Sequence, residues 1–216
     1  AEAVAKQAQN LEHVIFAGFT HQPAIELAEK LLSILPENQS KIFYSDNGST
    51  ANEVALKIAF QYWYNKGNEE RKKVIAFEGA YHGDTFGAMS VGDRGPFSAP
   101  FSPFLFEVEF LPMPTQGKDD ELIQQFYQLV DSGQVAAFIF EPLVLGSAGM
   151  KMYSAELLDK LINIAQEHDV ICIADEVFTG FGRTGKYFAS DYLGNKPDIF
   201  CLSKGLTGGT MALGVT

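Results

Sequence analysis

The sequence has 216 residues, of which 46% are hydrophobic and 20% charged, and its formal net charge is −11. This length is sufficient for one sizeable core, and so acidic a balance disfavours binding to nucleic acid or to an anionic membrane surface. No apolar run reaches the roughly 18 residues that span a bilayer. Cys172 and Cys201 fall in expected strands, which predicts buried reduced thiols. Together with the lack of a signal-peptide pattern, this favours a cytoplasmic protein.

Short apolar runs alternate with amphipathic stretches along the chain. We expect strands at 41–46, 73–77, 104–111, 135–142, 170–175, 197–204 and 211–216. We expect helices at 50–65, 119–132 and 154–169, and an irregular loop at 92–103. Because several strands are apolar on both faces and alternate with helices, we predict a doubly wound α/β fold with a mostly parallel, seven-stranded sheet. The last strand follows the short turn GLTGG and can return antiparallel.

The first strand ends before the turn Asp46-Asn47-Gly48, and a helix is expected to start near Ser49 or Thr50. In open α/β sheets, ligands bind outside the carboxyl ends of the strands. Free N–H groups at such a helix start form an anion site that suits phosphate. Thr50 and Glu53 have the spacing of a capping box, and on this segment alone a capped helix that binds nothing is favoured.

Tyr81, His82 and Asp84 follow the strand at 73–77 among glycines. The ring of Tyr81 could lie against a flat ligand, or it could cover the core. His82 beside Asp84 could indicate acid–base work, but no second histidine has metal-ligand spacing, so we expect no metal site. Glu141 lies at the end of another strand, and its position alone predicts a carboxylate exposed to solvent.

Asp175 and Glu176 end the apolar run VICIA, although burying an ionised carboxylate costs several kcal/mol unless it is paired. Asp175 should lie nearer the strand axis. A carboxylate in this position can pair with a cation or with a protonated ring nitrogen of a ligand. The alternative is a structural ion pair with Arg183 or Lys186.

Lys204 ends the apolar run 199–202, and it is either an ordinary exposed lysine or a group held in the same crevice as Asp175. A desolvated lysine has a lowered pKa and attacks carbonyl carbons. A phosphate site, a ring-stacking aromatic, an acid for a ring nitrogen and a Schiff-base lysine would then all lie at strand ends. Pyridoxal 5'-phosphate is the cofactor that uses this set.

The motifs DNGSTANEVALK, YHGDT, EP, ADEVFTGFGRTG and SKGLTGG, in this order, resemble those of the class III, fold-type-I pyridoxal-phosphate aminotransferases. The resemblance covers essentially the whole chain and implies the three-layer α/β sandwich of their large domain. Wider stretches, such as QYWYNKG and YHGDTFGAMSVGD, resemble the branch that acts in biotin synthesis. That branch implies S-adenosylmethionine as amino donor and 8-amino-7-oxononanoate as acceptor.

The resemblance implies that Lys204 bonds the cofactor and, once freed, shuttles a proton. It implies that Asp175 holds the pyridine nitrogen protonated, which answers what the positive partner of this carboxylate is. Gly48 and Ser49 would bind the phosphate at the helix start.

The resemblance also implies that Tyr81 stacks on the ring and helps to form the substrate pocket, while Val177 packs on the opposite face. Asp84 would take part in recognising the acceptor. Glu141 would lie near the phenolic oxygen of the cofactor or pair with an arginine. No role follows for His82.

Residues 1–40 are expected to form a helical lead-in, and 41–216 a domain that binds pyridoxal phosphate. The small C-terminal domain of the family, with the arginine for the substrate carboxylate, would lie outside this chain. The partners implied are small-molecule substrates and a second copy in a homodimer with its site at the interface. The alternatives are an ω-amino-acid or amine:pyruvate aminotransferase, or an inactive fragment. A nucleotide-binding Rossmann domain is disfavoured because G-x-G-x-x-G is missing.

Overall fold

The computed structural model of the protein describes residues 1–115 and 117–216. The chain divides into two compact units, Ala1–Lys41 and Ile42–Thr216. This division lies one residue from the expected boundary, and the role of each unit stays a prediction. Among the described residues, no helix combines the length and the apolar composition needed to cross a membrane.

The first unit contains two helices, α1 (Glu2–Asn10) and α2 (Gln22–Ile34). A proline in the first turn of α2 fits its start, because proline fixes the backbone in a helical φ and its missing N–H is not needed there. The ring of Phe16 stacks on His21, the residue before α2, with 5.3 Å between the ring centroids.

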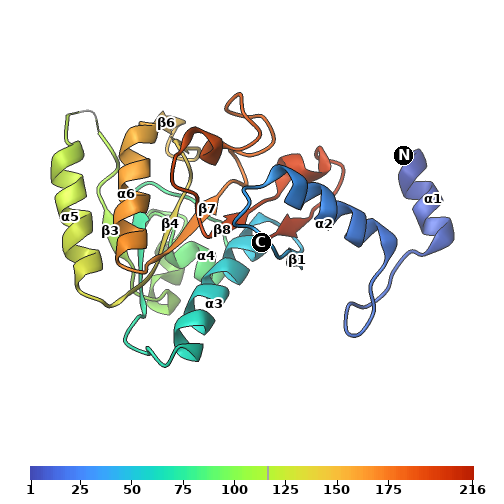
Figure 1. Cartoon of the computed structure of the whole chain (residues 1–216), viewed down its shortest axis with the longest axis horizontal. Helices are drawn as coiled ribbons and strands as arrows, with labels where there is room; N and C mark the ends of the chain where they lie inside the picture. Colours follow the sequence, from blue (N-terminus) through green and yellow to red (C-terminus); the bar gives the residue numbers. More distant parts are fainter. Residues whose placement is uncertain (116) are drawn as a thin grey trace. The chain divides into compact units, whose positions relative to one another are not determined.

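The second unit is built on a sheet of five parallel strands, in the order β3-β2-β4-β7-β8 (Figure 1). In that order the strands are Glu109–Leu111, Lys73–Phe77, Val135–Phe140, Ile171–Asp175 and Ile199–Cys201. Every neighbouring pair in this order is parallel. The mostly parallel α/β fold is therefore confirmed.

The first and last expected strands form a separate antiparallel pair. β1 (Tyr44–Ser45) pairs with β9 (Gly214–Val215), and Leu202 and Val215 form an isolated antiparallel bridge next to β8. The chain thus does return antiparallel after its glycine-rich turn. β8 ends at Cys201, and β9 contacts the next residue, Leu202, through the isolated bridge. The seven expected strands therefore form a sheet of five strands and a separate pair.

The loops contain structure that the periodicity did not predict. The helix α4 (Phe86–Ser90) and the 3-10 helix η1 (Ala99–Phe104) precede β3, which starts only at Glu109. Because η1 extends to Phe104, the first residue of the strand expected at 104–111 belongs to this helical turn instead. After β4, a small hairpin is formed by β5 (Val144–Leu145) and β6 (Lys151–Met152).

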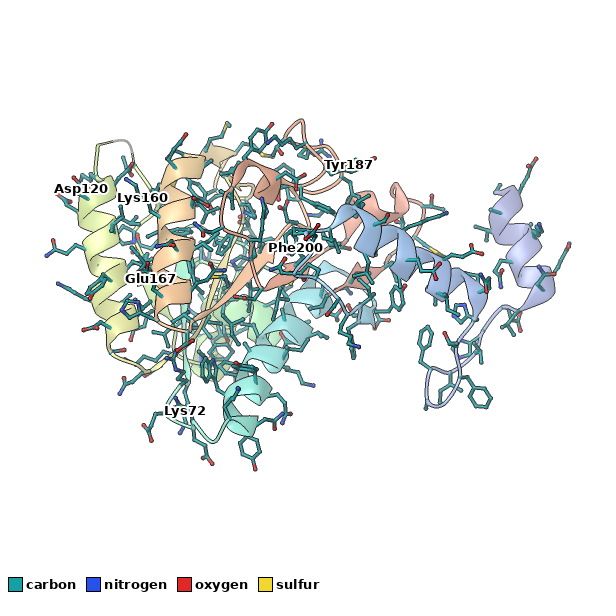
Figure 2. The ribbon with its side chains drawn as sticks, in the orientation of Figure 1. Lys72, Asp120, Lys160, Glu167, Tyr187 and Phe200 are labelled. Atoms are coloured by element: carbon teal, nitrogen blue, oxygen red, sulfur yellow. The ribbon has the colours of Figure 1, made fainter. Side chains whose placement is uncertain are left out.

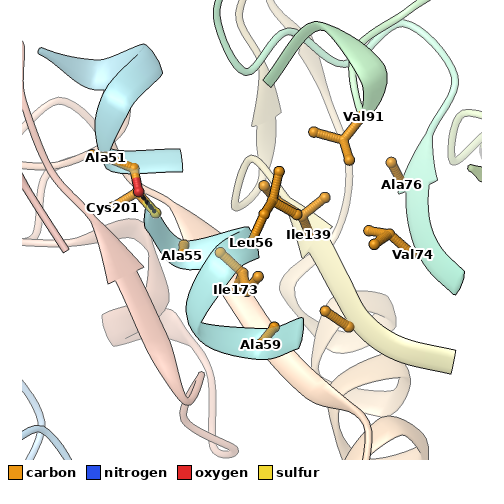
Figure 3. Close-up of a cluster of buried hydrophobic side chains, with 11 residues drawn as sticks. Ala51, Ala55, Leu56, Ala59, Val74, Ala76, Val91, Ile139, Ile173 and Cys201 are labelled. Carbon is orange, nitrogen blue, oxygen red and sulfur yellow. Dashed lines mark hydrogen bonds between the residues drawn. The ribbon is translucent and has the colours of Figure 1, made fainter. Parts of the chain in front are cut away.

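One face of the sheet is covered by the helix α3 (Gly48–Asn65). Small residues of this helix, including Ala51, Ala55 and Ala59, pack with Leu56 against alternate strand residues (Figure 3). The strand residues in this cluster are Val74, Ala76, Ala137, Ile139, Ile173 and Cys201. Because alanine side chains are small, α3 packs close to the sheet. The first turn of α3 therefore lies near the carboxyl ends of the strands.

The other face of the sheet is covered by α5 (Asp119–Asp131) and α6 (Ala155–Glu167), which pack against each other (Figure 1). Phe138, which points away from α3, packs its ring against Phe126 of α5 at 4.9 Å between centroids. Exposed side chains of the two helices, such as Lys160, lie on their outer surfaces (Figure 2). The fold is therefore the expected sandwich of helices, sheet and helices.

The fold generates a prediction for Phe138, which is fully buried and also contacts the rings of Phe77 and Phe140. Phe138→Ala should lower the free energy of unfolding by about 3–5 kcal/mol, because it removes apolar contacts and leaves a cavity. Phe97→Ala is the matched control, since Phe97 is 94% exposed, and it should change stability by no more than about 0.5 kcal/mol. Urea titration followed by circular dichroism measures both. Equal losses would contradict the assigned core.

Candidate active site

A cavity of about 520 Å³ lies where β2, β4, β7 and β8 end. Its lining includes these expected site residues: Gly48, Ser49, Tyr81, Glu141, Asp175, Val177 and Lys204. They come from loops far apart in the sequence, and the parallel register brings them to one edge of the sheet. Asp84 lies in an adjacent cavity of about 560 Å³, which shares Tyr81 with the first.

The start of α3 forms one wall of the cavity. The side chain of Asn47 accepts a hydrogen bond from Thr50 N, and Thr50 Oγ1 accepts one from Asn47 N. The backbone N–H groups of Gly48 and Ser49 donate to no group in the described part of the chain. A Cβ on Gly48 would lie 2.8 Å from Val177 Cγ1, so only glycine permits this close approach. The wall is thus a capped helix start with two free donors.

The expected capping pair Thr50–Glu53 is wrong, because Glu53 binds another segment. Its carboxylate accepts hydrogen bonds from Thr85 Oγ1 at 2.8 Å, Gly87 N at 3.2 Å and Ala88 N at 2.8 Å. These donors belong to the start of α4, directly after the loop that carries Tyr81. Glu53 therefore holds this loop against α3, a long-range contact that local spacing does not reveal.

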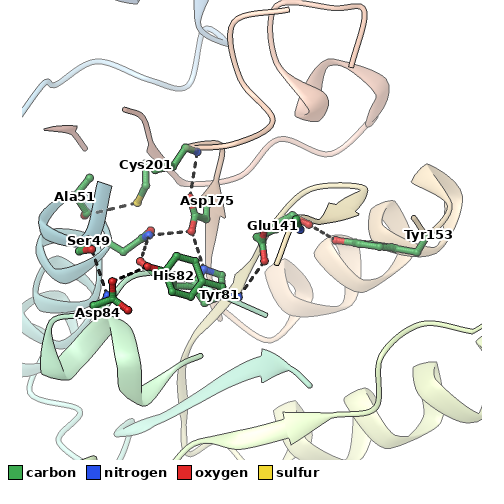
Figure 4. A network of polar contacts seen from close by, with 12 residues as sticks. Ser49, Ala51, Tyr81, His82, Asp84, Glu141, Tyr153, Asp175 and Cys201 are labelled. Atoms are coloured by element: carbon green, nitrogen blue, oxygen red, sulfur yellow. Dashed lines mark hydrogen bonds and ion pairs between the residues drawn. The ribbon is translucent and has the colours of Figure 1, made fainter. Parts of the chain in front are cut away.

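Asp175 is buried at the end of β7, and both of its carboxylate oxygens have partners (Figure 4). Oδ2 lies 2.7 Å from His82 Nδ1 and 2.8 Å from Asn52 Nδ2, and Oδ1 accepts from Val177 N at 3.1 Å. These contacts replace the water that burial removes.

The alternative ion pair of Asp175 with Arg183 or Lys186 is not formed in the described part of the chain. The guanidinium of Arg183 lies over the ring of Phe178, with 5.4 Å to its centroid. Lys186 Nζ donates instead to the carbonyl oxygen of Asp191 at 3.0 Å. Both basic side chains are therefore engaged elsewhere.

Glu176, the neighbour of Asp175, is completely buried and is held by neutral donors. Its carboxylate accepts from Ala189 N at 3.0 Å, from Ser190 N at 2.7 Å and from the hydroxyl of Thr179. Burial raises the pKa of Glu176, and these hydrogen bonds oppose the rise. The carboxylate ties the loop after β7 to the 3-10 helix η2 (Ala189–Tyr192), which is a structural role.

Glu141 is buried rather than solvated, and it joins two walls of the cavity. Its carboxylate accepts from Tyr81 N at 3.0 Å and from Gly146 N at 2.9 Å, while Tyr153 Oη donates to its backbone carbonyl at 2.6 Å. Burial raises the pKa of Glu141. No arginine pairs with it among residues 1–115 and 117–216, so the role that the resemblance implies stays a prediction.

Tyr81 lines the cavity as a residue that is 43% exposed, and its hydroxyl donates to Asp84 Oδ2 at 2.8 Å. Burial, and then the hydrogen bond to Asp84, raises the pKa of Tyr81 to about 12. The phenol therefore stays protonated and fixes the direction of the carboxylate. This couples the two residues that the sequence analysis placed in the substrate pocket.

Lys204 lines the same cavity as Asp175, and its side chain is exposed rather than desolvated. It starts the 3-10 helix η3 (Lys204–Thr207) with a φ of 44°, a left-handed conformation that is uncommon outside glycine. Its Nζ lies 5.8 Å from the centroid of the Phe178 ring, and no carboxylate pairs with it in the described residues. The amine is therefore available to react.

The structure adds two residues to the expected site, Asn52 and His82. Both are buried beside Asp175, whereas the sequence pattern assigns no role to His82 and does not single out Asn52. The signal for Asn52 was an uncharged polar residue beside Ala51 and Ala55, on the apolar face of a helix.

Comparisons with known proteins agree with this geometry. The family model "Aminotransferase class-III" matches residues 1–216, and the chain therefore belongs to the class-III aminotransferase family. An adenosylmethionine-8-amino-7-oxononanoate aminotransferase from Synechococcus elongatus is 53% identical, with 100% of this chain and 52% of the relative covered. A protein of the same name from Geobacter sulfurreducens is 42% identical, with 100% and 50% covered.

Two solved structures show the same fold. The adenosylmethionine-8-amino-7-oxononanoate aminotransferase from Methanocaldococcus jannaschii has a TM-score of 0.92 at 40% identity, with 99% of this chain and 50% of that chain covered. A PLP-bound amine transaminase from an uncultivated Pseudomonas species has a TM-score of 0.93 at 33% identity, with 99% and 52% covered. The chain spans about half the length of the curated relatives it matches.

The site generates a prediction for Glu176. Glu176→Gln should lower the free energy of unfolding by about 1–3 kcal/mol, because an amide cannot accept from all the buried donors that the carboxylate satisfies. Both oxygens of a carboxyl group can accept in either protonation state, whereas the NH2 group of glutamine only donates. Burial favours the protonated form of Glu176, so the stability that Glu176 contributes is largest below pH 4.5, its ordinary pKa, and falls as the pH rises through the folded-state pKa. The loss caused by the substitution should therefore shrink with rising pH.

Urea unfolding of both proteins between about pH 4.5 and 8 measures this difference. Glu107→Gln is the control, because Glu107 is exposed and should show no such trend. A loss for Glu176→Gln that grows with pH would contradict the assigned environment.

Proposed function

We propose that the complete protein is a pyridoxal-phosphate-dependent aminotransferase that transfers an amino group from S-adenosylmethionine to 8-amino-7-oxononanoate in biotin synthesis. The observation that carries this proposal is one cavity that combines Lys204, Asp175 and the free N–H groups at the start of α3. The substrates are inferred from relatives of that name, which are 53% and 42% identical over the whole chain.

The residues present fit pyridoxal phosphate. The N–H groups of Gly48 and Ser49 suit a phosphate, because a helix start favours an anion. Among residues 1–115 and 117–216, Asp175 Oδ1 accepts one hydrogen bond, from Val177 N, so it has a lone pair left for the N–H of a pyridinium. Lys204 lines the same cavity, and no carboxylate of the described residues pairs with its amine. Phosphate, ring nitrogen and aldehyde are thus each matched by a group of this chain.

The bound cofactor supplies an electron sink that makes a proton on the substrate Cα acidic. Lys204 would hold the cofactor and then carry that proton on Nζ. Asp175 would keep the ring nitrogen protonated. Tyr81 would cover one face of the ring and Val177 the other, which excludes water.

Two further residues would act on the edge of the site. Asp84, whose direction is fixed by the Tyr81 hydroxyl, would bind the amine of the acceptor. Glu141 would keep the loop at Tyr81 and the turn at Gly146 in place around the phenolic oxygen of the cofactor. We also infer from the family a cytoplasmic homodimer with its active site at the interface.

A second candidate is another class III reaction, with an ω-amino acid or a simple amine as donor. The likeness to the amine transaminase, at 33% identity, favours it. A third is that these residues alone form an inactive domain, since the chain spans about half of its relatives.

The proposal predicts that borohydride traps the cofactor on Lys204. The complete protein mixed with pyridoxal phosphate should develop a visible absorption band that borohydride abolishes, and peptide mass mapping should place the label on Lys204. Lys204→Ala should lose the label, while Lys186→Ala, a change at an exposed lysine engaged with Asp191, should retain it. A label spread over several lysines would contradict the assigned nucleophile.

The choice of donor can be tested by a single half-reaction, followed as loss of the visible band of the bound cofactor. S-Adenosylmethionine should bleach the band, and β-alanine should not. Restoration by 8-amino-7-oxononanoate should follow, because the amino group then passes to the acceptor. Bleaching by β-alanine alone would favour the ω-amino-acid reaction instead.

A further inference from the structure

Three buried polar side chains that line the cavity contact one another: Asn52 from α3, His82 from the loop after β2, and Asp175 from β7. Figure 4 shows His82 and Asp175 in this cluster. The exposed fractions of Asn52, His82 and Asp175 are 1%, 2% and 3%. Polar groups this deep in a protein are costly unless they are hydrogen-bonded, so their mutual contacts define how each can be oriented.

The amide of Asn52 has a fixed orientation. Nδ2 donates to the carbonyl oxygen of His82 at 2.7 Å and to Asp175 Oδ2 at 2.8 Å. Both partners are acceptors, so a flipped amide would place its oxygen against two other oxygens. Asn52 lies four residues after Gly48, on the same side of α3. The helix that presents the free N–H groups therefore also holds the carboxylate.

His82 adds a second donor to the same oxygen. Its Nδ1 lies 2.7 Å from Asp175 Oδ2, and an ionised carboxylate can only accept, so Nδ1 carries a proton. Oδ2 then accepts two hydrogen bonds, which occupies both of its lone pairs. Within the described part of the chain, Oδ1 accepts one hydrogen bond, from Val177 N, and retains one lone pair.

The cluster is not what stability alone would favour. Asn52 Oδ1 and His82 Nε2 are buried and have no hydrogen-bond partner among the described residues. Each such orphaned atom carries a desolvation cost, so an apolar cluster of the same shape would be more stable. Because this desolvation cost is retained in residues that line a cavity, we infer that the cluster serves to fix the orientation of Asp175.

We propose that Asn52 and His82 are positioning residues that occupy Oδ2 of Asp175 and thereby make Oδ1 the oxygen that accepts the hydrogen bond from the cofactor ring nitrogen. This inference rests on the proposed function. Neither residue touches the reacting atoms; both act through the carboxylate. Loss of either lets the carboxylate rotate and weakens its contact with the ring.

The test is a double-mutant cycle in the complete protein, with pyridoxal phosphate affinity measured by quenching of intrinsic fluorescence. Asn52→Leu, which keeps the volume but removes the donor, should weaken binding about tenfold. In an Asp175→Asn background the same change should weaken binding less than about twofold, because the group through which Asn52 acts is already altered. Asn65→Leu, at the exposed end of α3, is the matched control and should leave affinity unchanged.

His82 provides an independent measurement if Asn52→Leu fails to fold. His82→Asn places an amide nitrogen where Nδ1 lies, so it should retain affinity within about twofold, while His82→Leu should lose about tenfold. The absorption maximum of the bound cofactor should shift in His82→Leu and not in His82→Asn. A cofactor analogue with carbon in place of the ring nitrogen should bind His82→Leu and wild type equally.

The outcomes separate this inference from the function on which it rests. Equal losses for Asn52→Leu in both backgrounds, or a persistent loss with the carbon analogue, would overturn the positioning role alone. Failure of the unaltered protein to bind pyridoxal phosphate saturably would overturn the proposed function and, with it, this inference.

Discussion

The burial of one carboxylate is the constraint on which the site depends. Asp175 can remain at the end of β7 only because donors from α3 and from the loop after β2 reach it, His82 Nδ1 at 2.7 Å and Asn52 Nδ2 at 2.8 Å. Three segments that are far apart in the sequence are thus fixed by one group. The position of the loop that carries Tyr81 follows, since Tyr81 is the residue before His82.

The packing of α3 makes those contacts possible. Alanines at 51, 55 and 59 bring the helix close to the sheet, and this closeness lets Asn52 span the gap to β7. The same helix holds the start of α4 through Glu53. A larger side chain on the sheet-facing side would therefore disturb the site as well as the core, because the two share one element.

The sequence predicted the parallel strands and the strand-end residues, because alternating apolar runs and the rule for ligand position depend only on local pattern and on sheet geometry. It could not predict what those residues bind. Glu53 has the spacing of a local cap and yet serves α4, and Glu141 reads as solvated and yet is buried. Glu53 contacts Thr85 and Ala88, 32 and 35 residues further along the chain, and Glu141 contacts Tyr81, which lies 60 residues before it. Only the tertiary fold determines such contacts.

Asp175 and Glu176 show how one dipeptide acquires two roles. Asp175 is the last residue of β7 and Glu176 is the first residue beyond it, and the two carboxylates contact different groups. Glu176 turns toward η2, where its carboxylate accepts from the backbone N–H groups of Ala189 and Ser190 as well as from the hydroxyl of Thr179. Asp175 turns toward the cavity, where its Oδ1 retains acceptor capacity. Residue type and burial are nearly the same for both, and each accepts three hydrogen bonds from the described residues. The cavity that Asp175 lines is therefore what separates a carboxylate that can bind a ligand from a structural one.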